Sequence, residues 1–160
     1  MKTEMVYVIL YTLLQRHERA AEYYNKASDL AKSDDLAGLL KSLAAYREDL
    51  GLQVRRFLEN TSPVPMPNKN TEGLMPLIEK RWPELEEALA DNKRLEVISL
   101  CHETEQALSD YYRESLGQGQ QTAAGIQDLL QQQHDKILKV TRQTERLETV
   151  PQQRNIEIDI

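Results

Sequence analysis

The chain has 160 residues, of which 40% are hydrophobic and 29% are charged, and its formal net charge is −6. This length is typical of one domain with a substantial core, and the composition excludes a disordered chain. The acidic balance argues against a nucleic-acid-binding protein, because the chain lacks the basic excess that neutralises a phosphate backbone. The single cysteine, Cys101, excludes an intrachain disulfide and fits a reducing compartment.

The N-terminal part of the chain contains a nearly continuous apolar run at residues 5–14, followed by polar residues at 15–18. A membrane span needs about 20 apolar residues, so this run is too short. A signal peptide could hold a run of this size, but no small-residue cleavage site follows it and the helical pattern continues. We interpret the run as the buried start of a helix, and we expect a cytoplasmic protein with no membrane segment.

The prolines divide the chain, because proline is excluded from helix interiors. They are Pro63, Pro65, Pro67, Pro76, Pro83 and Pro151. The proline-free stretches 1–62 and 84–150 consist largely of strong helix formers, and two-residue alternation of β-branched residues occurs only at the very end. The sequence therefore predicts an all-α domain over residues 1–150 and a C-terminal tail at 151–160.

Four long helices are expected, at about 3–32, 36–59, 91–116 and 122–148. Ser33, with the acidic pair after it, suits the N-terminal cap of the second helix, and Gly117 suits the end of the third. The segment 61–90 begins proline-rich and ends in a short helix at 83–90.

The lengths of the connections predict the topology. The first and second helices, and the third and fourth, are joined by short links, so each pair is expected to form an antiparallel hairpin. The 61–90 connection is long enough to return along the whole bundle. Two hairpins joined by one long crossover form the ferritin-like arrangement of a four-helix bundle.

Each expected helix carries apolar residues three and four positions apart, interrupted once near its middle by a polar residue. These four polar residues, and two tyrosines on the same faces, form what we call the polar layer: His17, Tyr24, Arg47, Glu105, Tyr112 and Gln133. Because a buried charge must be paired, we expect Arg47 to pair with Glu105. We expect His17 within about one turn of Arg47, and Gln133 level with Glu105.

Two interpretations of the polar layer stay open. It is either a structural layer that fixes the register of the helices, or a remnant or working ligand site inside the bundle.

The helices lack the ligands of a di-iron carboxylate bundle, which needs a Glu-x-x-His pair on each of two helices. Gly51 occupies the histidine place on the second helix, and Gln131 occupies the glutamate place on the fourth. We therefore expect no catalytic residue and no cofactor. The alternative is a weak site for one iron, manganese or zinc ion, formed by His102, Glu105 and His134.

Several groups of residues in the second half of the chain resemble one protein family. They are Trp82-x-x-Leu85-x-x-Ala88-Leu89, Glu105, Ala107, Tyr112, Gln133-x-x-x-Ile137 and Arg146-Leu147. A looser likeness in the first two helices runs through Ala20-Ala21, Tyr24, Ala27 and Arg47. Over about residues 5–148 the chain thus resembles a bacterial family of uncharacterised ferritin-like four-helix-bundle proteins, known only as a domain of unknown function. The resemblance implies the ferritin-like fold and a cytoplasmic bacterial protein, and it implies no reaction, cofactor or catalytic residue.

These features predict a non-catalytic interaction or stress-associated protein. The alternative is a degenerate carboxylate and histidine metal-binding bundle with iron-related redox or storage activity. We also expect a homodimer, because the start of the first helix is apolar nearly all round and needs cover from a second copy or from the crossover. The residues concerned are Val6, Tyr7, Val8, Tyr11 and Leu14.

The tail carries the only two-residue alternation in the chain, with isoleucine at 156, 158 and 160 and acidic residues between them. Such a segment can add as a strand to the sheet edge of a protein partner. The alternatives are a disordered end or a segment that lies on its own bundle.

Overall fold

The computed structural model describes residues 2–61, 75–118, 124–149 and 158, and the parts of the chain within these ranges form helices and no strand. The helices are α1 (Lys2–Leu30), α2 (Asp34–Thr61), α3 (Leu77–Lys80), α4 (Trp82–Ala90), α5 (Arg94–Gln118) and α6 (Ala124–Thr149). The prediction of an all-α chain is confirmed.

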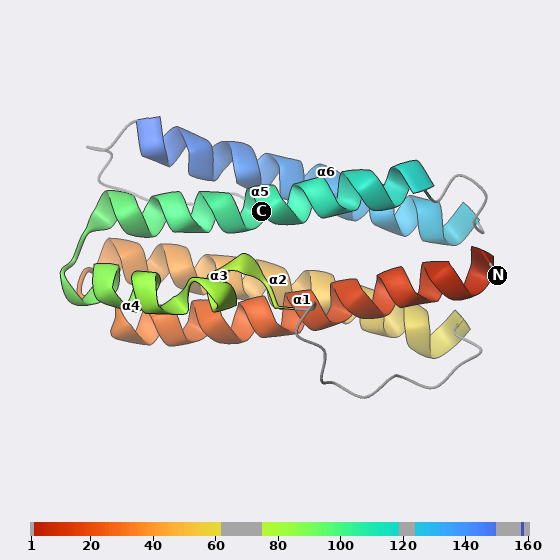
Figure 1. Ribbon diagram of the computed structural model, residues 1–160, viewed down its shortest axis with the longest axis horizontal. Coiled ribbons are helices and arrows are strands. Elements are labelled where there is room, and N and C mark those ends of the chain that lie inside the picture. The colour runs from red at the N-terminus through yellow and green to blue at the C-terminus, as the bar shows by residue number, and fades with distance from the viewer. Residues whose placement is uncertain (1, 62–74, 119–123, 150–157, 159–160) are drawn as a thin grey trace.

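The long helices form two antiparallel hairpins, α1 with α2 and α5 with α6, which lie alongside each other (Figure 1). Helix α2 ends where α1 begins, whereas α5 begins at the opposite end of the molecule, so α2 and α5 run in the same direction. The short helices α3 and α4 lie against both α1 and α5. This is the order of hairpin, crossover and hairpin that the connection lengths predict.

The ends of the helices follow local chemistry. The N–H of Leu36 lies 3.4 Å from Oγ of Ser33, and the acidic pair in the first turn of α2 favours that helix end. The predicted start of the third helix at 91 is too early, because Asn92 adopts a φ of 52°. This left-handed residue ends α4 in a Schellman motif, in which the N–H of Lys93 donates to the carbonyl of Ala88 at 2.8 Å.

Besides apolar packing, a salt bridge and an aromatic contact join the crossover to α1. Arg19 binds the carboxylate of Glu79 in α3 through two hydrogen bonds, of 2.7 Å from Nε and 2.5 Å from Nη2. The ring of Tyr23 meets that of Trp82 edge to face, with centroids 5.2 Å apart. Helix α3 is absent from the sequence prediction, because a helix of four residues is too short to show a period.

The core includes the inward apolar stripe of each long helix, together with buried residues of the crossover such as Ile78 and Leu85. The three- and four-residue spacing predicts these inward positions on the four helices, and all are buried except Ala31 and Phe57, which are half-buried and pack against the core: Leu10, Leu13, His17, Ala20, Tyr24, Ala27 and Ala31; Leu36, Leu40, Leu43, Arg47, Leu50, Val54 and Phe57; Ile98, Cys101, Glu105, Leu108 and Tyr112; Ile126, Leu130, Gln133, Ile137, Val140, Thr144 and Leu147. The spacing of apolar residues thus identified the inward faces.

The start of α1 is covered largely by the chain itself. Tyr7, Tyr11 and Leu14 are each at most 8% exposed, and the hydroxyl of Tyr7 donates to the carbonyl of Thr61 at 2.9 Å. Only Val8, at 62% exposure, presents a large apolar surface there among the residues whose side chains are described. Much of the predicted cover for this face thus comes from the chain itself, and the homodimer stays a prediction.

One position of the tail is described: Ile158 is partly buried and packs against the core. The rest of the predicted strand-adding segment lies outside the described residues. No helix in the described ranges is long and apolar enough to span a membrane.

Candidate functional site

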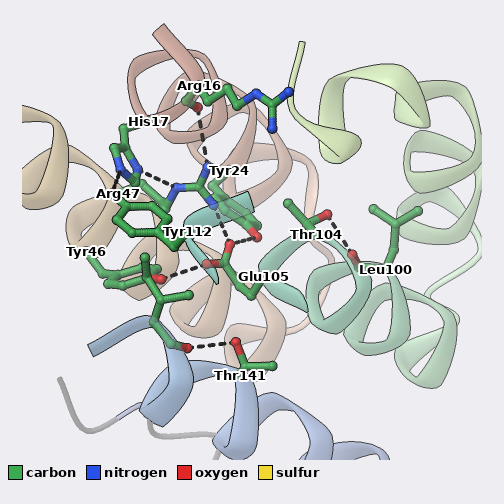
Figure 2. A network of polar contacts seen from close by, with 11 residues as sticks. Arg16, His17, Tyr24, Tyr46, Arg47, Leu100, Thr104, Glu105, Tyr112 and Thr141 are labelled. Carbon is green, nitrogen blue, oxygen red and sulfur yellow. Dashed lines mark hydrogen bonds and ion pairs between the residues drawn. The ribbon is translucent and has the colours of Figure 1, made fainter. Parts of the chain in front are cut away.

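The centre of the polar layer is an ion pair between α2 and α5. Nη1 of Arg47 lies 2.7 Å from Oε2 of Glu105, and the two side chains are 1% and 0% exposed (Figure 2). A buried ion pair needs further hydrogen bonds on both partners to offset the loss of hydration. Both residues have them.

The carboxylate of Glu105 accepts hydrogen bonds on both oxygens. Oε1 accepts from the hydroxyl of Tyr46 at 2.8 Å, and Oε2 accepts from the hydroxyl of Tyr24 at 2.6 Å besides Arg47. Burial, and next the charge of Glu105, raise the pKa values of Tyr24 and Tyr46 well above the ordinary tyrosine value, so both hydroxyls remain donors. Three donors from two helices thus satisfy one carboxylate.

The guanidinium of Arg47 also contacts α1. Its Nε donates to Nδ1 of His17 at 3.1 Å, and its Nη2 lies 3.4 Å from the carbonyl of Arg16. Burial alone would lower the pKa of Arg47, but the nearby carboxylate of Glu105 opposes this and the net direction is upward. Arg47 is therefore a permanent buried cation that joins three helices.

From His17 the hydrogen bonds continue across the bundle to α6. Nε2 of His17 lies 2.7 Å from the hydroxyl of Tyr112, which donates to Oε1 of Gln133 at 2.6 Å. Nε2 of Gln133 in turn donates to the carbonyl of Leu50 and to Oε1 of Gln53, each at 3.0 Å. The network therefore connects all four long helices.

The direction of these bonds fixes the protonation of His17. Because Nδ1 accepts from Arg47, the single proton of a neutral imidazole lies on Nε2, which then donates to Tyr112. Burial, followed by the charge of Arg47, lowers the pKa of His17 well below its ordinary value of 6.5. Geometry and electrostatics agree on a neutral histidine.

The six residues predicted for the polar layer all belong to this one network. Sequence reasoning missed Tyr46, although its spacing from Leu43 and Leu50 places it on the same inward face. The contact of Gln133 also differs from expectation: its partner on α5 is Tyr112, about two turns beyond Glu105.

The backbone of α2 comes close to α1 beside this network. A Cβ atom added to Gly51 would lie 3.2 Å from Cβ of His17, tighter than ordinary van der Waals contact. The glycine in the histidine place of the di-iron pattern therefore lets α1 and α2 approach where Arg47 reaches His17.

The three residues of the alternative metal site have separate contacts. His102 pairs with Thr144 at 3.1 Å, and His134 lies 3.3 Å from Oγ of Ser109, while Glu105 binds Arg47. Within the described ranges no group of three or more histidine, cysteine, aspartate or glutamate residues is arranged to hold a metal ion.

Comparisons with protein-family models, with curated proteins and with solved structures give no match to this chain.

Proposed function

We propose that this protein is a non-catalytic bundle of the ferritin-like type that acts through its surface as an interaction protein, with the polar layer serving to fix helix register. The observation that carries the proposal is the ion pair between Arg47 and Glu105. Metal-binding carboxylate bundles direct glutamates inward with oxygens available to the metal. Here both oxygens of Glu105 already accept hydrogen bonds, and one donor is a cation that repels a metal ion.

The pattern of contacts supports the structural role of the layer. Arg47 on α2 binds His17 on α1 and Glu105 on α5, and Tyr112 on α5 binds Gln133 on α6. Sliding one helix past another by a turn moves its side chains about 5.4 Å and breaks these bonds. Buried polar groups with this property favour one register over the others.

The competing function is that of a degenerate metal-binding bundle, and metal analysis separates the two. Protein purified without chelators is analysed for iron, manganese and zinc beside the matched variant His102→Ala/His134→Ala. We expect well under one metal ion per chain in both proteins. Near-stoichiometric metal in the natural chain, lost in the variant, would favour iron-related redox or storage activity instead.

We also propose that the chain forms a homodimer in the bacterial cytoplasm. The dimer proposal rests on Val8, which is 62% exposed at the start of α1, and the location rests on the resemblance described above. Light scattering at micromolar concentration tests the dimer, with Val8→Glu as the variant expected to separate it. A monomer mass for the natural chain would contradict the proposal.

A further inference from the structure

A groove lies on the outside of the first hairpin, between α1 and α2. Its volume is about 330 Å³, and the described residues that line it all belong to these two helices. Glu22, Glu48 and Leu52 are among them and are exposed, so the groove opens to solvent. None of the described lining residues belongs to the polar layer, and this surface is therefore separate from the site described above.

The floor of the groove is apolar and is formed by small residues. Ala21 of α1 is 3% exposed, and Gly51 of α2 is buried. Because these two positions carry so little side chain, the space above them can receive a side chain of another molecule. Leu52, which is 43% exposed, adds a larger apolar group at the edge. The groove thus offers apolar contact to an aliphatic side chain.

The charges around the groove favour a cation beside Glu48. The other two carboxylates of the lining are paired: Glu18 with Arg55, and Glu22 with Lys26 of the same helix, whose Nζ lies 3.5 Å from Oε1 of Glu22. Glu48 forms no ion pair with any residue in the described ranges, and its described hydrogen bond comes from a neutral side-chain amide. A cation that enters the groove can therefore pair with Glu48 without displacing an existing ion pair.

The groove suits a side chain that is aliphatic along its length and cationic at its end, as in lysine. Lysine packs its methylene groups on apolar surface and keeps its ammonium group in water, where the ammonium can pair with an exposed carboxylate. An extended peptide commonly binds by adding to the edge of a sheet, and the described part of this chain contains no strand. A helix, in contrast, packs its side chains into the groove between two other helices.

We propose that the protein binds a basic amphipathic helix of a protein partner through this groove, an inference that rests on the interaction role proposed above. An apolar residue of that helix contacts Ala21, Gly51 and Leu52, and a lysine three or four positions away pairs with Glu48. Because the groove is small, the complex belongs to the weak, transient class.

A synthetic helix of about five turns, or about 18 residues, tests the proposal. It is an alanine-based, fluorescently labelled peptide with leucines and lysines three and four positions apart on one face. Fluorescence anisotropy is expected to show saturable binding of one peptide per chain. No saturable binding up to about 1 mM, or equal binding of the same peptide with glutamate in place of lysine, would overturn the proposal. Metal content tests the proposed function separately, so failure of the groove and failure of that function are distinguishable.

Variants locate the binding on the surface. Leu52→Gln and Glu48→Gln each replace an exposed residue with a good helix former, so the fold should be retained. We expect each variant to raise the Kd for the lysine peptide by at least about threefold. The matched controls are Leu95→Gln and Glu86→Gln, which remove the same groups from exposed positions of α5 and α4 that do not line the groove. The controls should bind as the natural chain does, and equal affinity of groove and control variants would overturn the assignment.

Discussion

His17 and Arg47 meet inside the bundle as a neutral imidazole and a permanent cation, joined by a hydrogen bond of 3.1 Å from Nε of Arg47 to Nδ1 of His17. Because Nδ1 accepts from the arginine, the proton of the histidine lies on Nε2, and Nε2 therefore donates to the hydroxyl of Tyr112. One charged residue of α2 thus determines the direction of the hydrogen bonds as far as α6.

The first prediction concerns the coupling of Arg47 and Glu105. Replacing either residue alone, as Arg47→Met or Glu105→Leu, leaves the partner as an unpaired buried charge. We expect each single variant to lower the free energy of unfolding by about 3–5 kcal/mol. The double variant should lose clearly less than the sum, because it leaves neither charge behind. Urea denaturation of the four proteins measures this cycle, and additive losses would contradict the coupling.

The second prediction concerns the pH dependence of stability that arises from His17. The folded state disfavours protonation of this imidazole, whereas the unfolded chain takes up a proton near pH 6.5. The unfolded state therefore binds more protons below pH 6.5, and acid lowers the free energy of unfolding by up to about 1.4 kcal/mol per pH unit. Above pH 6.5 this contribution to stability is fully present.

Denaturation of the natural chain and of His17→Gln at pH 8 and pH 5 measures this effect. Glutamine can accept from Arg47 and donate to Tyr112 without titrating, so the variant should lose less stability on acidification. Some dependence remains, because burial also lowers the pKa of His134. Equal losses in the two proteins would show that His17 does not contribute.

The inward faces could be predicted because the spacing of residues along a helix determines which face of that helix each side chain lies on. His17, Glu105 and Gln133 interrupt apolar seams, and each proved to be buried. The identity of their partners could not be read in the same way. Tyr46 fits an apolar position through its ring, so the sequence pattern does not show that its hydroxyl binds Glu105.

Contacts between helices, and contacts with the crossover, depend on register, which residue spacing leaves open. Gln133 reaches Tyr112 because of how α5 and α6 are offset, and that offset depends on their connection. The pair of Arg19 and Glu79 joins residues 60 positions apart across a proline-rich segment. Many carboxylates of the chain could have paired with Arg19, and only the fold selects one.

The third prediction concerns the close approach of α1 and α2 at Gly51. In a helix interior, alanine is favoured over glycine by about 1 kcal/mol. At Gly51, however, the added Cβ would lie 3.2 Å from Cβ of His17, whose ring is fixed by Arg47 and Tyr112. We therefore expect Gly51→Ala to lower the free energy of unfolding by about 1–3 kcal/mol.

Gly38 provides the matched control for this prediction. It lies in the same helix, and a Cβ added there meets nothing within 4 Å. Gly38→Ala should therefore raise stability by about 0.5–1 kcal/mol, measured by the same denaturation. Equal stabilisation by both substitutions would show that α1 and α2 have room to spare beside His17.

The fourth prediction concerns the attachment of the crossover through Glu79. Its carboxylate accepts two hydrogen bonds from Arg19, and its side chain is 5% exposed, so Glu79→Gln removes the charge from a largely buried contact. Because Arg19 is partly exposed, we expect a modest loss of about 1 kcal/mol in stability. The larger effect should be local, since α3 is a single turn with few other bonds. Hydrogen exchange at the amides of Lys80 and Arg81, which donate to Pro76 and Leu77, should accelerate, while amides of α1 and α2 keep their protection.

Glu84→Gln is the control for this fourth prediction. Glu84 pairs with Arg81 at an exposed position, so its loss should change the free energy of unfolding by less than about 0.5 kcal/mol. Unchanged exchange in the Glu79→Gln variant would mean that the bond to Arg19 is not needed to hold α3, and that apolar packing such as that of Ile78 and of Trp82 on Tyr23 is sufficient.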